Sequence, residues 1–225
     1  MNYKHNINYF KDGDGLKLLG IALAVVGGLV FYFGWSYISY ILSCIAIPVG
    51  LFLFFWSTGR RSRDEDLDED IRERCKGTTI DWSAEKRLSL RRNKEFDPFV
   101  LGGYEYKDGL LFKKPKDGSL RSSLYTTAEI AVLEDALYIF TTSFSLIADE
   151  CTDQKIEISF SDIQGIELTD EEKQLTCGKN TFRVKDHRLV LRYGEENIIS
   201  LPVNHSLEAD LFAERLRRVL PQTTA

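Results

Sequence analysis

Histidine and cysteine are scarce in this chain of 225 residues, which contains three His and four Cys. No HExxH pattern places two histidines on one face of a helix, and no two cysteines have the CxxC spacing of a zinc site or a redox motif. The scarcity and the spacing argue against a zinc site and against a disulfide framework. We expect no metal and no cofactor.

Sequence motifs of common catalytic sites are also missing. The chain contains no GxSxG, no Walker phosphate-binding sequence and no GxGxxG between a strand and a helix. His187 and His205 are expected in a turn and beside a helix cap, which are structural positions. We therefore expect a binding protein and not an enzyme, and no residue set identifies a small-molecule substrate.

A net positive charge is absent as well. The 34 Asp and Glu residues outnumber the 29 Lys and Arg residues, which gives a formal charge of −5. Residues 1–17 carry three Lys and two Asp, and residues 18–59 carry no charge, so a charge of −6 falls on the remainder. Because general nucleic-acid binding requires a basic surface, we expect no nucleic-acid partner.

What the chain does contain is an apolar tract from Leu18 to Gly59 without a charged residue. As one helix, at ~1.5 Å per residue, the tract would be about 60 Å long, twice the ~30 Å hydrocarbon core of a bilayer. Division at residues 34–37 gives two helices of about 20 residues, the length of one crossing. The tract predicts a two-helix transmembrane hairpin in contact with membrane lipid.

The orientation of this hairpin is predicted by the charges that flank it. Three lysines precede the tract, three arginines follow it, and the turn between the helices carries none; these residues are Lys4, Lys11, Lys17, Arg60, Arg61 and Arg63. Positive residues remain on the cytoplasmic side of a membrane. We expect both termini in the cytoplasm and the hairpin in the cell membrane, with the three arginines also placed to contact anionic lipid.

Small residues recur at helical spacing within the tract. They are Gly20, Ala24 and Gly28 in the first helix and Ser43, Ala46 and Gly50 in the second. Such stripes let helix backbones approach closely in lipid. Two interpretations follow: the two helices of one chain pack on each other, or copies of the chain associate.

A helical connector is expected over residues 60–95. Acidic residues between Asp64 and Asp70 followed by Arg72, Arg74 and Lys76 match the dipole of a helix, and Gly77 ends it. We interpret this helix as a solvated stalk. A second short helix is expected after Asp81, with Trp82 and Leu88 as its main apolar contacts.

Residues 96–225 show the alternation and turn residues of β-strands. Runs near residues 110–113 and 120–125, two runs on either side of Glu134-Asp135, and Lys155–Phe160 predict strands. Residues 169–180 are expected to be a polar loop. The following residues are expected to form three short strands, with turns at residues 185–187 and 194–196.

A closing amphipathic helix is expected from Ser206 to Leu220. Ser206 provides an N-cap, arginines occupy the last turn, and Pro221 follows. Its apolar stripe is expected to contain Leu207, Leu211, Phe212, Leu216, Val219 and Leu220. The fold class is therefore a membrane protein with an N-terminal segment (1–17), a transmembrane α-hairpin (18–59), a connector (60–95) and a mainly-β cytosolic domain with a C-terminal helix (96–225).

The stretch from Ala136 to Leu168 resembles bacterial PH-like and GRAM-like domains of the pleckstrin-homology superfold. The resemblance rests on a hydrophobic strand, a loop, and a strand that ends in Asp162-Ile163 with Ile166 after a short spacer. It extends over roughly residues 101–220, where the terminal helix takes the place of the helix that plugs such a sandwich. It implies lipid binding, protein docking or assembly as function. A different small β-barrel with a terminal helix is the alternative.

The resemblance also implies a place for a lipid headgroup, on the first hairpin of the domain. The candidate residues there are Lys113, Lys114, Lys116 and Arg121. Ser122-Ser123 follow Arg121 where phosphoinositide-binding members have a closing basic pair, so specific phosphoinositide recognition is not expected. We expect a non-enzymatic scaffolding protein that binds a protein partner or its own copies at the membrane. The alternatives are an accessory subunit of a transport or secretion complex and an anionic-lipid-binding module.

Overall fold

The computed structural model describes residues 3–10, 14–34, 36–59, 63–115, 118–177, 180–194, 196–204 and 206–219. The chain forms two compact units, Asn2–Leu67 and Asp68–Ala225. The first unit is helical. The second contains the β-sheets.

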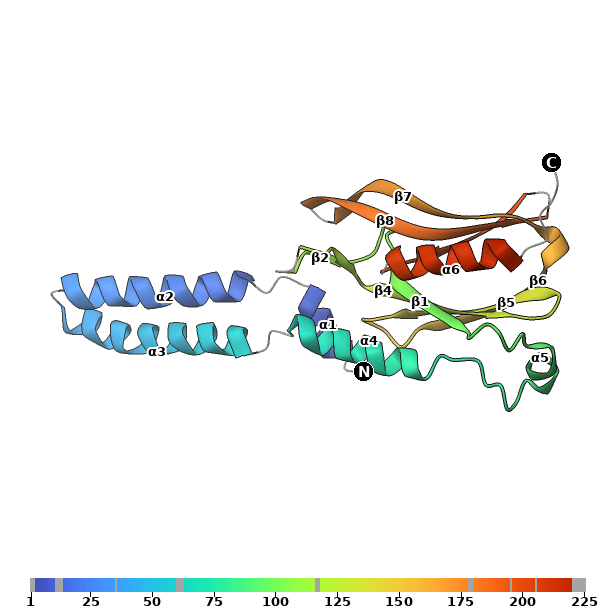
Figure 1. Ribbon diagram of the computed structural model, residues 1–225. Helices are drawn as coiled ribbons and strands as arrows, with labels where there is room; N and C mark the ends of the chain where they lie inside the picture. The colour runs from blue at the N-terminus through green and yellow to red at the C-terminus, as the bar shows by residue number, and fades with distance from the viewer. Residues whose placement is uncertain are drawn as a thin grey trace. The chain divides into compact units, whose positions relative to one another are not determined.

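Two long apolar helices dominate the first unit (Figure 1). A short helix, α1 (Tyr3–Phe10), precedes α2 (Asp14–Phe33) and α3 (Tyr37–Gly59). The segments Gly15–Phe33 and Tyr37–Ser57 are long and apolar enough, by length and composition, to cross a membrane. The expected break falls where the sequence places it, because the Gly34 N–H closes the last turn of α2 on the Val30 carbonyl at 2.9 Å.

Small residues bring the backbones of α2 and α3 together. A Cβ atom added to Gly50 would lie 2.6 Å from the Ala24 amide nitrogen and 2.7 Å from the Gly20 carbonyl oxygen. The third small residue of α2 at this interface is Gly27, because a Cβ added to it would lie 3.1 Å from the Ala46 Cβ. These glycines therefore permit an approach that larger side chains would block.

Two other residues of the expected stripes lie differently. Ser43 is buried, and its hydroxyl donates to the Ser39 carbonyl at 2.8 Å, which satisfies the hydroxyl within its own helix. Gly28 has nothing within 4 Å of an added Cβ and faces away from α3. The four-residue spacing from Ala24 to Gly28 thus does not mark the packed face, which continues through Gly27.

Helix α4 (Asp64–Lys76) has the charge order that its sequence predicts. Acidic residues fill its first turn, Arg74 and Lys76 its last, and the following Gly77 donates its N–H to the Arg74 carbonyl at 3.1 Å. From Asp68 onward, however, this helix lies against the β-domain. Asp68 pairs with buried Arg121 at 2.9 Å, and the Arg74 guanidinium lies 5.9 Å from the centre of the Phe144 ring. This half of the helix is packed and not a solvated stalk.

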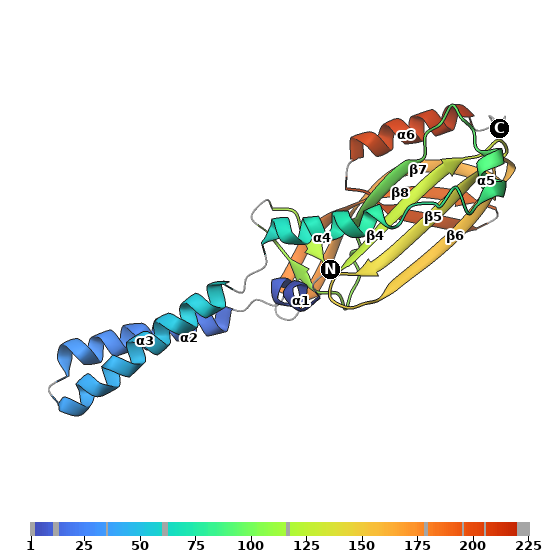
Figure 2. The same cartoon turned by 90° about the horizontal axis from the view of Figure 1, so that it is seen from below.

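The connector between α4 and the first strand is also packed on the domain. Its helix is shorter than expected, α5 (Lys86–Arg91), because the Asp81 carboxylate instead accepts the N–H groups of Ser83 and Ala84 in a turn. Ile80 and Leu88 are buried against Ala131, Leu133, Ala136 and Tyr138. The Ile80 N–H donates to the buried Glu129 carboxylate at 2.6 Å. Figure 2 shows α5 and the connector over the face of the β4–β5–β6 sheet.

The first sheet is a four-stranded antiparallel meander with the order β1-β4-β5-β6. Its strands are β1 (Phe99–Tyr104), β4 (Leu124–Val132), β5 (Ala136–Ser145) and β6 (Cys151–Ser159). Two short strands, β2 (Phe112–Lys113) and β3 (Arg121–Ser122), form a separate pair between β1 and β4 in the chain. The expected strands near residues 110–113 and 120–125 and the turn at Glu134-Asp135 are confirmed.

The second sheet differs from the prediction. It has the order β7-β8-β9, with β7 (Ile163–Cys177), β8 (Asn180–Tyr193) and β9 (Asn197–Pro202), and a 3-10 turn (Phe160–Asp162) joins it to β6. The predicted polar loop at residues 169–180 is wrong for Thr169–Cys177, which continue β7, and for Asn180, which begins β8; residues 178–179 lie outside the described residues. The predicted turn at residues 185–187 is wrong because β8 passes through it. Cross-strand charge pairs, such as Lys173 with Asp186 at 2.6 Å, explain why so polar a segment is a strand.

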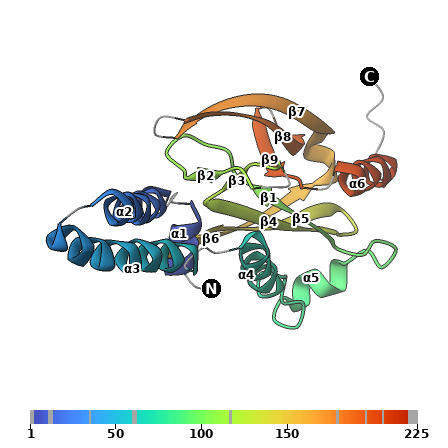
Figure 3. The ribbon, with the colours of Figure 1, turned by 90° about the vertical axis from the view of Figure 1, so that its left-hand side faces the viewer.

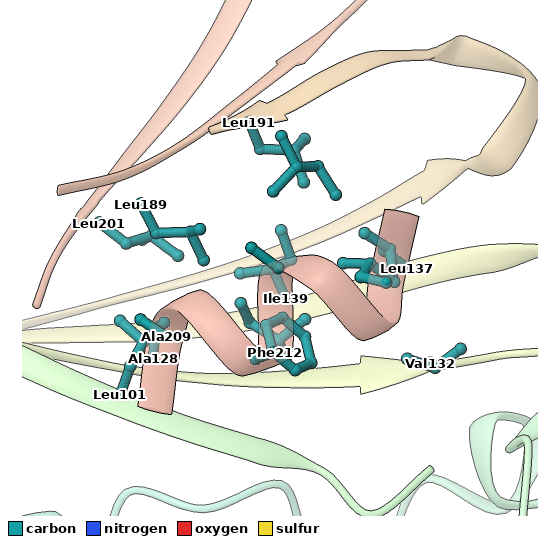
Figure 4. Close-up of a cluster of buried hydrophobic side chains, with 14 of the residues drawn as sticks. Leu101, Ala128, Val132, Leu137, Ile139, Leu189, Leu191, Leu201, Ala209 and Phe212 are labelled. Atoms are coloured by element: carbon teal, nitrogen blue, oxygen red, sulfur yellow. The ribbon is translucent and has the colours of Figure 1, made fainter. Parts of the chain in front are cut away.

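The two sheets enclose one apolar core, and α6 (Ser206–Val219) lies beside them at the edge shown in Figure 3. Figure 4 shows part of this core, to which both sheets and α6 contribute. The helix buries Ala209, Phe212, Ala213 and Leu216, and the Phe212 ring stacks on Phe99 at 4.3 Å between centroids. Leu207 and Leu211 are 71% and 52% exposed, so their predicted place in the apolar stripe is wrong. The described part of the chain is therefore two apolar helices, a mainly-β domain and a C-terminal helix.

The packing of α2 on α3 predicts which glycine tolerates a large side chain. Gly27→Cys with Ala46→Cys, in a Cys44→Ala background, should form an intramolecular disulfide because the two Cβ atoms are close. Adding Gly50→Leu should lower the disulfide yield several-fold, since overpacking costs about 1–3 kcal/mol. Gly28→Leu is the matched control and should leave the yield unchanged. Gel mobility measures it, and a dimer band in place of the intramolecular product would contradict this packing.

Candidate functional site

The four cations proposed for a lipid headgroup do not form one group in the structure. Lys113 lies on β2, and Lys114 is exposed just after it. Lys116 lies outside the described residues. Arg121 is 5% exposed and directed to Asp68, so its charge is neutralised within the domain. Of the candidates that the structure describes, Lys113 and Lys114 are those that remain near the surface.

Of the three arginines predicted to set the topology, the structure describes Arg63. Arg60 and Arg61 lie outside the described residues. The Arg63 N–H donates to the Asp66 carboxylate at 3.0 Å, which helps to begin α4, and the Arg63 side chain is exposed.

A buried ionic cluster joins the segment after β1 to the second sheet. The Arg188 guanidinium lies 3.2 Å from the Glu105 carboxylate and 3.3 Å from the Asp186 carboxylate. It also donates to the Ser200 hydroxyl at 2.6 Å and to the Ser200 carbonyl at 2.8 Å. Asp186 in turn accepts from Lys173 at 2.6 Å. The guanidinium is thus surrounded by acceptors, and the cluster is a structural joint.

Electrostatics within this cluster keep its members charged. Burial by itself would raise the pKa of Glu105, but the charge and hydrogen bonds of Arg188 outweigh it and leave that pKa below its usual value. Burial would lower the pKa of Arg188, but Glu105 and Asp186 outweigh it and leave that pKa raised. The ion pair therefore remains formed at neutral pH.

A polar cavity of about 550 Å³ lies on one side of the cluster. Its floor is the inner face of the first sheet, where Thr126, Thr141 and Ser143 replace the aliphatic residues found further along the same strands. Its other walls come from β6, from the end of β8 and from β9. Glu105 and Glu150 balance Lys107 and Arg188 among its lining residues, so the cavity has no excess of positive charge.

A second cavity, of about 580 Å³, lies on the other side of the cluster and is basic. Lys114, Arg183 and Lys185 line it, together with Tyr104, Tyr106 and Asn204. Its acidic member, Asp186, is 1% exposed and already paired with Arg188 and Lys173. Burial raises the pKa of Tyr106 to about 12, and its hydroxyl donates to the Leu120 carbonyl at 2.6 Å. We call this space the basic cavity.

Sequence reasoning missed both features. Arg183 and Lys185 alternate with Phe182 and Val184, which is the pattern of one polar strand face, but nothing in the sequence places them beside Lys114. The pairing of Glu105 with Arg188 joins residues 83 positions apart. Neither the basic cavity nor this ion pair is indicated by a local sequence pattern.

The ionic cluster predicts a pH-dependent stability of the domain. Because the folded pKa of Glu105 is lowered, its contribution is complete above the ordinary value of 4.5 and is lost as the pH falls below it. Glu105→Gln should cost about 2–4 kcal/mol at pH 7, somewhat less than the ~3–5 kcal/mol of a fully broken buried pair, because Asp186 still faces Arg188. The same variant should lose less stability than the wild type as the pH falls from about 5 to about 2.

Urea unfolding of the full chain in detergent micelles, followed by the circular dichroism of the sheets, measures this effect. Glu171→Gln removes an exposed carboxylate that lies 3.8 Å from Lys173 and serves as the control. It should cost about 0–0.5 kcal/mol, as a surface pair does. Equal losses in the two variants would contradict the role of the buried cluster.

No group of three or more His, Cys, Asp or Glu residues that could hold a metal ion occurs among the described residues. Comparison with known proteins gives no match to the chain, whether with family models, curated proteins or solved structures.

Proposed function

We propose that this protein is a membrane-anchored scaffold that holds a protein-binding β-domain at the inner face of the cell membrane. The observation that carries the proposal is the outward apolar surface of α2 and α3. Phe31, Leu42 and Phe52 are 49%, 58% and 59% exposed. A pair of helices that exposes such side chains around its circumference is unstable in water and suited to lipid.

The orientation of the anchor is proposed from charge. The described helices α2 and α3 contain no charged side chain after Lys17, whereas lysines and arginines lie on either side of the pair in the sequence. The positive residues favour a cytoplasmic location for both ends. The domain that begins in α4 is then cytoplasmic.

A PH-like identity of the domain is supported by the order of its strands. Four antiparallel strands in chain order, β1, β4, β5 and β6, precede three more, β7, β8 and β9, and a helix closes the domain. Antiparallel strands followed by one closing helix are the features on which the resemblance to the pleckstrin-homology superfold rests. The fold alone leaves the ligand open, because PH-like domains serve lipid binding, docking and assembly.

Docking of a protein is the function that the surface of the domain favours. Arg121, one of the four headgroup candidates, is paired with Asp68, which weakens the basis for a lipid site on the first hairpin. The two cavities have the size of ligand sites, and one of them lies along a strand edge. A membrane tether raises the effective concentration of such a domain, so modest contacts are sufficient.

A second candidate function, an accessory subunit of a membrane complex, is favoured by Gly28. Its position on the outward side of α2 leaves a notch in the apolar surface, with no atom within 4 Å of an added Cβ. Another transmembrane helix could approach there.

The topology is tested with a membrane-impermeant maleimide on intact cells. Ser36→Cys, in the turn between α2 and α3, should be labelled from outside. The exposed Cys151 of the wild type should be labelled only after lysis. Release of the protein by alkaline carbonate, or labelling of wild-type Cys151 in intact cells, would refute the anchor.

Crosslinking and mass spectrometry of the full chain in its native membrane tests the function. Crosslinks from residues 68–225 to a second protein or to another copy would support the scaffold. Crosslinks confined to α2 and α3 would support the accessory subunit instead, and Gly28→Leu should then abolish them.

A further inference from the structure

One half of β8 has a free edge. Strand β9 pairs with β8 from Arg188 to Tyr193, and the ladder is extended by the Val203 N–H, which donates to the His187 carbonyl at 2.9 Å. Before His187, the described residues of β8 pair only with β7. The other edge of residues 181–186 borders the basic cavity.

The alternation of a strand determines which backbone groups this edge presents. The N–H and C=O of one residue point to the same side, and the side alternates along the strand. Because the His187 carbonyl points to the β9 side, so do the groups of Lys185, Arg183 and Thr181. No hydrogen bond to the backbone groups of these three residues on that side is formed within the described chain. The edge therefore offers three residues that can pair with an extended chain.

The charges beside this edge are of one sign. Arg183 and Lys185 are exposed, and Lys114 faces them across the basic cavity. None of the three forms an ion pair among the described residues. Glu172 is the cross-strand neighbour of Lys185 and Gln174 that of Arg183, so one of the two β8 cations has no acid opposite it.

The other face of β8, beside the same free edge, is largely apolar. Phe182 and Val184 lie on this face and pack against Phe112, Leu120 and Tyr106. Asp186, on the same face, is buried and paired with Arg188. A chain that pairs with this edge thus has cations on one of its faces and aromatic and aliphatic residues on the other. Side chains that alternate between acidic and apolar would match both faces.

The walls of the basic cavity restrict the occupant to a single extended segment. Gly103, Ser119 and Asn204 bound the space across from β8. An added Cβ at Gly103 would already lie 3.0 Å from Pro202, so this wall is closely packed. A second copy's sheet would bring further strands against these residues, whereas one segment without neighbouring strands needs only the room beside β8.

We propose that the free edge of β8 binds an extended segment of a partner protein in which acidic and apolar residues alternate. The segment adds a strand at Thr181–Lys185, its carboxylates pair with Arg183, Lys185 and Lys114, and its apolar side chains lie near Tyr106 and Leu120. This inference rests on the proposed scaffold function and names the kind of partner that the domain docks.

The experiment uses the full chain in detergent micelles and a fluorescein-labelled peptide of alternating Glu and Val. Anisotropy should report saturable binding that weakens with salt, since the ion pairs are exposed. Arg183→Glu with Lys185→Glu should weaken binding about tenfold or more, because two attractive contacts become repulsive. A Lys-Val peptide should regain binding to this variant.

Two controls separate this mode from a general attraction between charges. Lys86→Glu with Lys94→Glu makes the same change in net charge at exposed positions outside the basic cavity and should bind as the wild type does. Two Glu-Val peptides, one methylated on the Glu nitrogens and one on the Val nitrogens, should differ, because only the N–H groups on the side facing β8 are required for strand addition. The peptide methylated on that side should lose binding, and the other should keep it.

Absence of wild-type binding, or equal binding by all three proteins, would overturn the proposal. Retained binding of both methylated peptides, or displacement of the peptide by a second copy of the chain, would do so as well. None of these results would refute the scaffold, whose own test is the crosslinking of the domain in its native membrane.

Discussion

The ion pair between Glu105 and Arg188 is the constraint on which the described surface of the β-domain depends. It joins the segment that leaves β1 to the middle of β8, and the polar and basic cavities lie on either side of it. Its charges are fully compensated, with Asp186 and Lys173 completing the cluster. A compensated buried pair adds little net stability compared with apolar packing, but loss of one partner is costly. The pair therefore determines position more than it adds stability.

Local patterns were sufficient to predict the helices and several of the strands. The apolar tract with its central glycine predicted α2 and α3, and the order of charges predicted α4. The prediction failed where the local structure depends on residues that are distant in sequence. Thr169–Cys177 are polar enough for a loop, but they form a strand because β8 supplies matching charges. Phe212 and Leu216 are buried as predicted, but α6 leaves Leu207 and Leu211 exposed and turns Ala209 and Ala213 toward the sheets in their place.

The candidate site was less predictable than the fold. Lys114 was identified from its place on a basic hairpin, but its neighbours Arg183 and Lys185 come from a strand about 70 residues later. Arg121 was grouped with the lysines because it is close to them in sequence. The structure directs it to Asp68 on α4, a contact between segments 53 positions apart. Charge in a sequence thus indicates which residues can form a basic surface, and only the fold decides which of them are neutralised.

Exposed strand edges usually carry charges that prevent aggregation, so protection is the simplest reason for cations on β8. The other edges of the domain show what protection alone looks like. On β6, Lys155 pairs with Glu85 and Glu157 pairs with Arg91. On β7, Glu167 pairs with Arg192, and Asp170 shares a hydrogen bond with His187. Those edges carry charges of both signs and most of the charges named here are paired, although Glu172 on β7 forms no ion pair among the described residues. The edge from Thr181 to Lys185 is different because both of its cations, Arg183 and Lys185, lack an ion pair with any residue that the structure describes, and a third cation, Lys114, lines the same cavity. Uncompensated charge of one sign beside free backbone groups favours an acidic strand more than it repels strands in general.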